Sequence, residues 1–299
     1  MTNALLYAAV VTVWGTSWIM IKFQVETVPA DASVAYRFVI AAALMFAWAV
    51  ARGLPLRFRA RDHLFLALLG ALIFCTNYVL FYLAAEILAT GLLAVVFSTA
   101  SAMTMLINAA VTRTLPPARL AAGAALGVAG IALVFWPELA GLAGRDDAAL
   151  GLLLSVGGTL SFSFGSLVAT RNQKAGLSVR GSTAWGMMYG AVLLTIFVLL
   201  RGGHFGFDTG FAYVGSLIYL AVIGTIIAFA CYFALLGRIG PERAAYATVL
   251  FPVVALGIST IFEGYEWTAA ALAGVMLTLV GNVLVLGGPR QLARQGATA

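Results

Sequence analysis

The sequence predicts an all-α integral membrane protein with ten transmembrane helices in a five-plus-five repeat. Three observations support this fold class: the composition, the length of the apolar runs and an internal duplication. Of the 299 residues, 63% are hydrophobic and only 9% are charged. Soluble domains are about 45–50% apolar and about 25% charged. This chain has too few polar residues to cover a water-facing surface, so we expect it to reside in a lipid bilayer.

The apolar runs distinguish between the two architectures that can span a bilayer. Backbone polar groups must be paired internally in lipid, which leaves helices or a closed β-barrel. Barrel strands alternate apolar and polar residues over about 10 positions. The runs in this chain do not alternate and are about 20 residues long, the length that a helix needs to cross the hydrocarbon core.

The clearest internal repeat relates residues 66–82 to residues 220–236. LALLGALIFCTNYVLFY recurs as LAVIGTIIAFACYFALL, 154 positions later. A second echo relates GAALGVAGIALV from Gly123 to GVMLTLVGNVLV from Gly274, at an offset of 151. A unit of half the chain is too long for a solenoid repeat and suits a duplicated membrane bundle.

Ten spans follow from the apolar runs, with proline and glycine marking the breaks between them. No loop is long enough to hold a soluble domain. We expect a first repeat at 1–137, a second repeat at 148–288 and a short cytoplasmic tail at 289–299. The predicted spans are 4–23, 33–51, 64–84, 89–111, 118–136, 149–169, 181–200, 212–236, 242–262 and 268–287.

The charges support this count and suggest the orientation. With a cytoplasmic N-terminus, 13 of the 17 Lys and Arg residues fall on the cytoplasmic side, three on the other side and one, Arg37, inside a span. Nine of the 11 acidic residues fall opposite. Positive charge gathers on the cytoplasmic side of membrane proteins, so we expect both termini there. Two tandem units of five spans must insert in opposite orientations, which predicts an inverted-topology repeat with substrate near the midplane, as in secondary transporters.

Aromatic and polar side chains inside the spans are the candidates for substrate binding. Several aromatic residues are four positions apart and so share one helical face, as Trp14 and Trp18 do. The residues predicted to bind substrate are Trp14, Ser17, Trp18, Asn77, Tyr78, Tyr82, Thr99, Ser163, Trp185, Tyr189 and Tyr246. The alternative for each hydroxyl is a bond to its own or a neighbouring helix, and Trp or Tyr near a span end can be an interfacial anchor.

Arg37, Gly15 and Pro252 are predicted to have structural or gating roles. Arg37 lies about one turn into the second span, where a charged group usually pairs or snorkels, so we expect a structural ion pair. The candidate partners are Glu26, Asp31 and Glu86. Pro252 removes one backbone hydrogen bond from the ninth span, which produces either a packing kink or a hinge.

No carboxylate lies near the centre of any span. This favours facilitated transport or exchange over a proton relay through a buried acid. The chain also lacks HExxH, GxSxG and Walker motifs. Cys75 and Cys231 lie within apolar runs, as expected for small buried hydrophobic residues. The sequence therefore predicts no enzyme, no metal site and no cofactor.

The order and spacing of several motifs resemble the EamA-type transporters of the drug/metabolite transporter superfamily. The resemblance covers essentially the whole chain as two repeats. More narrowly, the chain resembles YddG-type exporters of aromatic amino acids from a Gram-negative inner membrane. The matching features are Trp14-Gly15-Thr16-Ser17-Trp18 in the first span, Arg37-Phe38 in the second, the Gly-x-x-x-Gly-x-x-Gly pattern of the fifth and Leu-Phe-Pro-Val at 250–253.

The resemblance implies ten helices around a central cavity and export of amino acids, aromatic and other neutral ones, by alternating access. Many family members have Glu just before the proline of the second-half motif, where this chain has Phe251. Hydroxyl groups and Asn77 are suited to meet a zwitterion without a fixed charge. Ten spans can form a complete pathway, so we expect a monomer, with no nucleic-acid partner. The alternatives are export of drug-like or other small metabolites, and a non-transporting scaffold or receptor.

Overall fold

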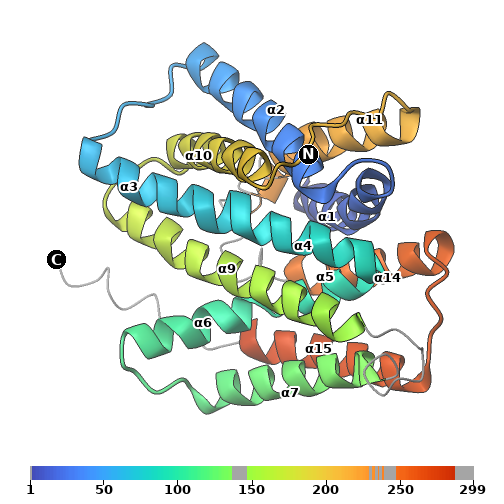
Figure 1. The fold of residues 1–299 in the computed structure, drawn as a ribbon. Coiled ribbons are helices and arrows are strands. Elements are labelled where there is room, and N and C mark those ends of the chain that lie inside the picture. Colours follow the sequence, from blue (N-terminus) through green and yellow to red (C-terminus); the bar gives the residue numbers. More distant parts are fainter. Residues whose placement is uncertain are drawn as a thin grey trace.

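The computed structural model describes residues 2–136, 147–228 and 247–286, together with residues 231, 232, 235 and 238 (Figure 1). Every regular element in these ranges is a helix. The elements are α1 (Asn3–Val25), α2 (Ala30–Ala51), α3 (Ala60–Leu69), η1 (Gly70–Thr76), α4 (Asn77–Ile87), α5 (Thr90–Ser98), α6 (Ala100–Val111), α7 (Ala118–Val134), α9 (Ala148–Lys174), α10 (Val179–Leu200), α11 (Phe211–Ile218), η2 (Tyr219–Ile227), α14 (Ala247–Phe262) and α15 (Ala269–Leu286).

These elements join into ten helical stretches, because α3, η1 and α4 form one run, as do α5 with α6 and α11 with η2. Seven stretches are at least 18 residues long and apolar enough to cross a membrane. The three shorter apolar stretches are Ala118–Val134, Phe211–Ile227 and Ala247–Phe262. Where the structure describes both, the helices begin and end within five residues of the predicted spans.

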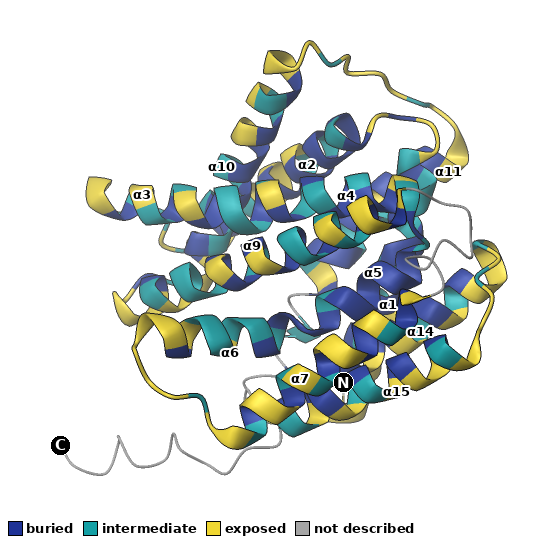
Figure 2. Ribbon diagram, turned by 60° about the horizontal axis from the view of Figure 1, so that its bottom comes forward, coloured by how far each residue is buried: buried dark blue, intermediate teal, exposed yellow. Residues whose placement is uncertain are grey.

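The outer faces of the bundle are apolar, and buried positions lie where helices meet (Figure 2). Large hydrophobic side chains remain exposed on the outside, including Leu153 at 69%, Leu200 at 83% and Phe211 at 93%. Soluble monomers rarely expose apolar surface on this scale, whereas lipid solvates it without cost. The described residues therefore form an integral membrane bundle of helices, as predicted.

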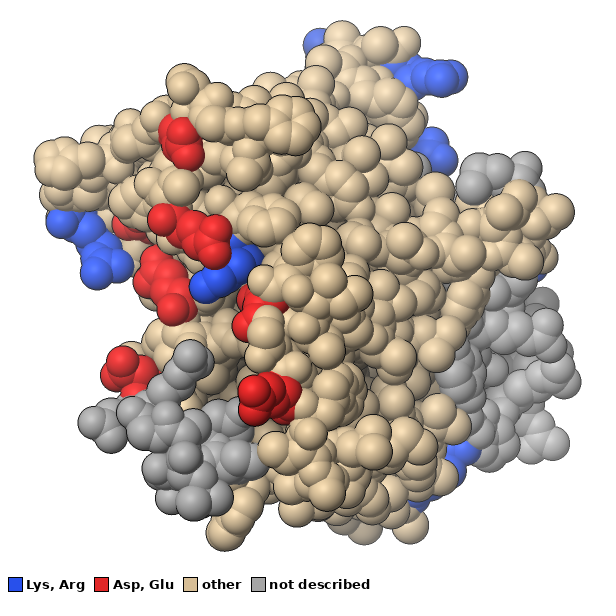
Figure 3. All heavy atoms as spheres, turned by 90° about the vertical axis from the view of Figure 1, so that its right-hand side faces the viewer, with Lys and Arg blue, Asp and Glu red and all other residues tan. Residues whose placement is uncertain are grey.

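One end of the bundle gathers acidic side chains. Figure 3 looks onto the end at which α4 stops and the connection between α14 and α15 lies in Figure 1. Several Asp and Glu side chains lie close together on this face. This agrees with the prediction that the acidic residues collect on one side of the membrane.

Helices from the two halves of the chain pack against each other in matched pairs. Helix α7 lies along α15, α2 along α10, and α5 along α14. The contact of α4 with α9 has a counterpart in the contacts of α11 and η2 with α1. Helix α1 also packs on α14, as α9 packs on α5 and α6. Each pairing therefore recurs when the five stretches of one half are exchanged for those of the other.

Glycines allow α7 and α15 to touch backbone to backbone. A Cβ added at Gly130 would lie 2.5 Å from the Gly274 carbonyl oxygen, and one at Gly274 equally close to the Gly130 oxygen. Gly123 and Gly281 repeat this reciprocal contact at 2.7 and 2.5 Å. Small residues permit such close approach between helices in membranes. The second sequence echo is thus a helix-packing motif.

The first sequence echo contains a feature that apolar periodicity does not predict. Both copies include a π-helical segment, η1 in the first half and η2 in the second. In η2 the Thr225 hydroxyl donates to the Leu220 carbonyl, five residues earlier, at 2.8 Å. π-Helical turns are rare and occur frequently at functional sites.

Candidate functional site

Trp18 lies at the centre of an aromatic cluster drawn from α1, α4, α5 and α14. Its ring centroid lies 5.2 Å from that of Phe81, 5.9 Å from that of Phe97 and 6.4 Å from that of Phe251. Phe81 and Phe97 meet edge to face at 5.5 Å. Such pairs contribute about 0.5–1.5 kcal/mol each beyond the area they bury. This Trp18 cluster, comprising these four rings, joins both halves of the chain in the interior.

A buried polar network lies beside this cluster, with one side chain each from α1, α2, α4 and η2. Arg37 is 3% exposed, and its Nη1 donates to the Tyr82 hydroxyl at 3.3 Å. Its Nη2 donates to the Thr225 hydroxyl at 3.4 Å. The Tyr82 hydroxyl donates in turn to Gln24 Oε1 at 2.6 Å. These four residues, which we name the Arg37 network, connect the two halves through Thr225.

The predicted ion pair of Arg37 is wrong. Glu26, Asp31 and Glu86 all lie in the part of the chain that the structure describes, yet none has an oxygen within 4.0 Å of the Arg37 guanidinium. Asp31 precedes Arg37 by six positions, which turns it about 240° away around the helix. The guanidinium points inward instead.

Aromatic rings take the place of the expected carboxylate at Arg37. The guanidinium carbon lies 4.7 Å from the Tyr78 ring centroid and 5.6 Å from the Phe38 centroid. Phe38 and Tyr78 themselves meet edge to face at 4.7 Å. A cation held over an aromatic face gains about 2 kcal/mol when it is desolvated. The predicted residues Tyr78 and Tyr82 therefore meet at Arg37.

The middle of α1 contacts the second half through two further side chains. The Trp14 ring lies 5.1 Å from that of Tyr232. The Thr16 hydroxyl lies 2.5 Å from the Tyr219 hydroxyl. The Trp-Gly-Thr-Ser-Trp motif thus presents both tryptophans to ring partners, Trp14 to Tyr232 of the second half and Trp18 to rings of both halves.

Gly15, Ser17 and Pro252 lie where α1 meets the second half. A Cβ at Gly15 would lie 2.6 Å from Val254, so glycine permits close contact between α1 and α14. The Ser17 hydroxyl donates to the Val13 carbonyl of its own helix at 2.6 Å. Pro252 is buried within α14, directly after the ring that packs on Trp18. Helix contacts account for Gly15 and Ser17 in this conformation.

Asn77, Thr99 and Ser163 are buried, and protein carbonyls accept their hydrogen bonds. Asn77 Nδ2 donates to the Gly158 carbonyl of α9 at 2.9 Å. The Thr99 hydroxyl donates within its own helix at 2.7 Å. The Ser163 hydroxyl donates within α9 at 2.8 Å and to a carbonyl of α6 at 3.2 Å. In this conformation Asn77 and Ser163 hold helices together, and the Thr99 bond is local.

Trp185 and Tyr189 belong to a separate group around His63. The His63 ring lies edge-on to the Trp185 ring at 4.7 Å, and its Nδ1 lies 2.9 Å from the Tyr189 hydroxyl. Trp185 Nε1 donates to the Leu56 carbonyl at 2.8 Å. Among the described residues no ring contact joins this group to the Trp18 cluster. Tyr246 lies outside the described residues.

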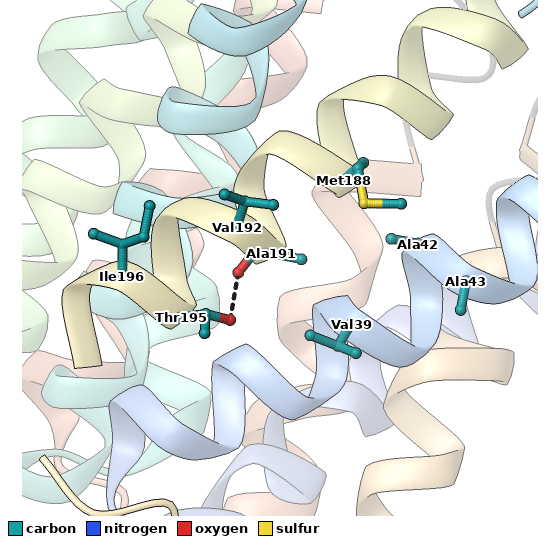
Figure 4. A pocket seen from close by; sticks show the side chains of 8 residues that line it. All are labelled: Val39, Ala42, Ala43, Met188, Ala191, Val192, Thr195 and Ile196. Carbon is teal, nitrogen blue, oxygen red and sulfur yellow. Dashed lines mark hydrogen bonds between the residues drawn. The ribbon is translucent and has the colours of Figure 1, made fainter. Parts of the chain in front are cut away.

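Two open grooves mark the outside of the bundle, and both are lined mainly by apolar side chains. The first, of about 320 Å³, lies between α2 and α10, and no charged side chain points into it (Figure 4). The second, of about 440 Å³, is lined by residues of α3, η1, α6 and α9, and Arg171 is the charged residue among them. No residue predicted to bind substrate lines either groove. The Trp18 cluster and the Arg37 network lie in the packed interior instead.

The sequence model of the EamA-like transporter family matches residues 1–136 and 149–287. The chain belongs to the EamA-like transporter family. The membership agrees with the prediction of a membrane transporter rather than an enzyme.

Relatives of this EamA-like protein include named transporters. It is 26% identical to a protein of Salmonella typhimurium described as a "probable amino-acid metabolite efflux pump", over 91% of this chain and 90% of that one. It is 28% identical to the "uncharacterized inner membrane transporter YedA" of Escherichia coli K12, over 92% and 90%. One solved crystal structure matches its fold with a TM-score of 0.66 at 18% identity, covering 97% of this chain and 99% of the other.

Sequence reasoning missed two members of the Arg37 network of this EamA-like protein. Gln24 lies in the last turn of α1, where a polar residue is easily taken for part of a loop. Thr225 lies in the second copy of the first echo, next to Gly224. The available signal was a hydroxyl side chain within an otherwise apolar run.

Proposed function

We propose that this protein is a secondary transporter that exports amino acids, aromatic and other neutral ones, across the inner membrane by alternating access. The observation that carries the proposal is that the Trp18 cluster and the Arg37 network take adjacent residues of α4. Phe81 of the cluster and Tyr82 of the network are successive residues of α4. An aromatic surface beside fixed polar groups suits a cargo that is apolar at one end and charged at the other.

We infer two repeats, 1–137 and 148–288, of inverted topology around a central path, followed by a cytoplasmic tail at 289–299. The matched helix pairs, the reciprocal glycine contacts of α7 with α15 and the presence of a π-helical segment in each half support this inference. The two stretches that match the family also support it. Both termini then lie in the cytoplasm, and one chain suffices for transport.

The printed names of the relatives support the cargo and the membrane. One is described as an amino-acid metabolite efflux pump and another as an inner membrane transporter. The binding residues proposed for the path are Trp14, Ser17, Trp18, Asn77, Tyr78, Tyr82, Thr99, Ser163, Trp185, Tyr189 and Tyr246. Gly15 and Pro252 have packing or gating roles in this proposal.

Counterflow in proteoliposomes tests the proposed function. Vesicles loaded with unlabelled phenylalanine should take up labelled phenylalanine or tryptophan in a saturable manner. Trp18→Leu removes the central ring of the aromatic cluster and keeps an apolar side chain, and it should lower this exchange at least tenfold. Trp136→Leu is the matched control, because Trp136 is 61% exposed at the end of α7.

The outcomes separate the alternatives. Loss of exchange in Trp18→Leu with retention in Trp136→Leu supports an aromatic-lined amino-acid path. Folded wild-type protein that exchanges no amino acid refutes the proposed cargo. Flux of drug-like solutes by the same vesicles would then identify a different exporter, and absence of any flux would favour a scaffold or receptor.

A further inference from the structure

The Arg37 network contains two buried donors for which the part of the chain that the structure describes offers no acceptor. They are the Nε–H of Arg37 and the Nε2 amide group of Gln24. Gln24 is fully buried, and Arg37 is nearly so. Buried donors in folded proteins almost always have an acceptor. Two orphaned donors in one cluster therefore leave capacity for an acceptor from outside the network.

The hydrogen-bond directions in this network start from Arg37, which can only donate. A guanidinium has five N–H donors and no acceptor, so the Tyr82 oxygen must accept from Arg37 Nη1. Tyr82 then has one proton left, which it donates to Gln24 Oε1. The amide of Gln24 is thereby oriented with its NH₂ group free to donate. Both orphaned groups consequently require an acceptor, not a donor.

The network also carries a positive charge without a matching anion. None of the carboxylates in the described ranges forms an ion pair with Arg37. The two bonds from Arg37 to hydroxyls are 3.3 and 3.4 Å long, whereas charge-assisted bonds to an anion are about 2.7–2.9 Å. Charged residues within membranes usually pair or face a substrate path. The missing component is a small anion with more than one acceptor atom.

We propose that the Arg37 network receives the carboxylate of the transported amino acid. This inference rests on the proposed function and names the contact that recognises the cargo. Phe81 of the Trp18 cluster directly precedes Tyr82 on α4, and Tyr82 bonds both Arg37 and Gln24. A ligand whose carboxylate meets Arg37 and Gln24 thus directs its side chain toward the Trp18 cluster. An amino acid can meet both the Arg37 network, with its carboxylate, and the Trp18 cluster, with its side chain. The corresponding amine lacks the carboxylate and can meet only the cluster.

Thr225 connects the site to movement of the two halves. It is the member of the network that comes from the second half, through its contact with Arg37 Nη2. Separation of η2 from α2 frees that donor and opens a route to the buried guanidinium. The carboxylate then replaces Thr225 as the acceptor. Substrate binding and the approach of the halves are coupled at this one contact.

Gln24→Glu gives the sharpest test, because it installs a carboxylate of the same size inside the network. The variant should unfold at a higher temperature than wild type, since Arg37 gains a counterion. It should also lose at least tenfold in phenylalanine counterflow. If Arg37 and Gln24 serve only to hold helices together, Gln24→Glu would be at least as active as wild type, and the proposal would fail.

A selectivity ratio supplies a second readout that does not depend on expression level. Wild type should exchange phenylalanine at least tenfold faster than phenylalanine amide, which keeps the ring and the amine but lacks the carboxylate. Arg37→Gln should bring this ratio close to one, and Arg37→Lys should restore part of it. Arg171→Gln, at a half-buried arginine beside Asp62 and far along the sequence from the network, is the matched control and should leave the ratio unchanged. An unchanged ratio in Arg37→Gln would overturn the assignment.

Anion binding can be measured without transport. Phenylacetate, a carboxylate with an aromatic ring, should raise the melting temperature of the detergent-solubilised wild type but not that of Gln24→Glu. No shift in wild type, or a shift produced by chloride and not by phenylacetate, would refute the carboxylate site. Failure of the proposed function has a different signature, since wild type would then bind phenylacetate but exchange no amino acid.

Discussion

The contact of α7 with α15 and the Arg37 network both join the first half of the chain to the second, but by opposite means. At α7 and α15, glycines remove the side chains, and the backbones approach until an added Cβ would collide at 2.5 Å. In the Arg37 network, long polar side chains meet at 3.3 and 3.4 Å and leave two donors without an acceptor. One contact is complete, and the other has unused binding capacity.

This difference separates structural from functional positions better than residue type does. Both regions are buried, and both include residues of a sequence motif: the glycines of the second echo at α7 and α15, and Arg37 of the Arg37-Phe38 motif. A contact without spare donors or volume can only hold helices together. A contact with a buried charge and orphaned donors is costly for stability, and a protein retains such a group where a ligand compensates it.

Gly130→Ala should have the largest effect, because its Cβ would press on the backbone of α15. We expect a loss of about 2 kcal/mol or more of stability from overpacking, seen as a lower melting temperature and less monodisperse protein in size-exclusion chromatography. Gly127→Ala on the same helix is the control. Its Cβ would meet only Thr99 at 3.6 Å, so helix propensity should make it neutral or stabilising by up to about 1 kcal/mol. Equal losses in both variants would contradict the backbone contact.

Tyr82→Phe should have an intermediate effect on stability and a large effect on transport. The change removes the acceptor of Arg37 and the donor to Gln24, which leaves buried polar groups unpaired at a cost of about 1–3 kcal/mol. Thermal unfolding and counterflow measure the two effects. Tyr213→Phe removes one bond between neutral hydroxyls, to Ser33 at 3.2 Å. A larger loss of stability in Tyr213→Phe than in Tyr82→Phe would contradict the cost assigned to the unpaired groups of Arg37 and Gln24.

Glu263→Gln should have the smallest effect of the three. The Glu263 carboxylate follows α14 and accepts hydrogen bonds from the Thr90 amide and hydroxyl at the start of α5, and from Ser259. Loss of the charge at this helix N-terminus should cost about 1 kcal/mol, measured by thermal unfolding. Glu266→Gln, at an exposed position of the same loop, should be neutral. If both variants unfold like wild type, the link between α5 and α14 contributes nothing.

Much of the fold could be predicted because bilayer thickness fixes the length of an apolar run. The helix boundaries follow from that length and from the prolines and glycines between runs. The glycine echo lies on the packing surface of α7 with α15, where a residue without a side chain permits close approach. These inferences use only residues close together in the sequence.

The candidate site could be predicted less well, because its contacts join distant residues. Arg37 meets Tyr82 and Thr225, which lie 45 and 188 positions further along the chain. Acidic residues close to Arg37 in the sequence were the expected partners, but Asp31 lies on a different face of α2. Asn77 has the right chemistry for a zwitterion, yet it faces a carbonyl of α9. The rotation of each helix decides its partners, and apolar runs without a polar face do not reveal that rotation.

The π-helical turns have a consequence for how this chain tolerates changes in length. A π-helical turn holds one residue more than an α-helical turn, so η1 behaves as a single-residue insertion that the helix has absorbed. Every side chain after it is rotated by about 100° relative to an uninterrupted α-helix. Asn77, Tyr78 and Tyr82 all follow η1 in the same stretch. Deletion of one residue from Gly70–Thr76 should therefore restore a regular helix and leave these three side chains on the same face, whereas a change that made this segment α-helical at its present length would turn them by about 100°.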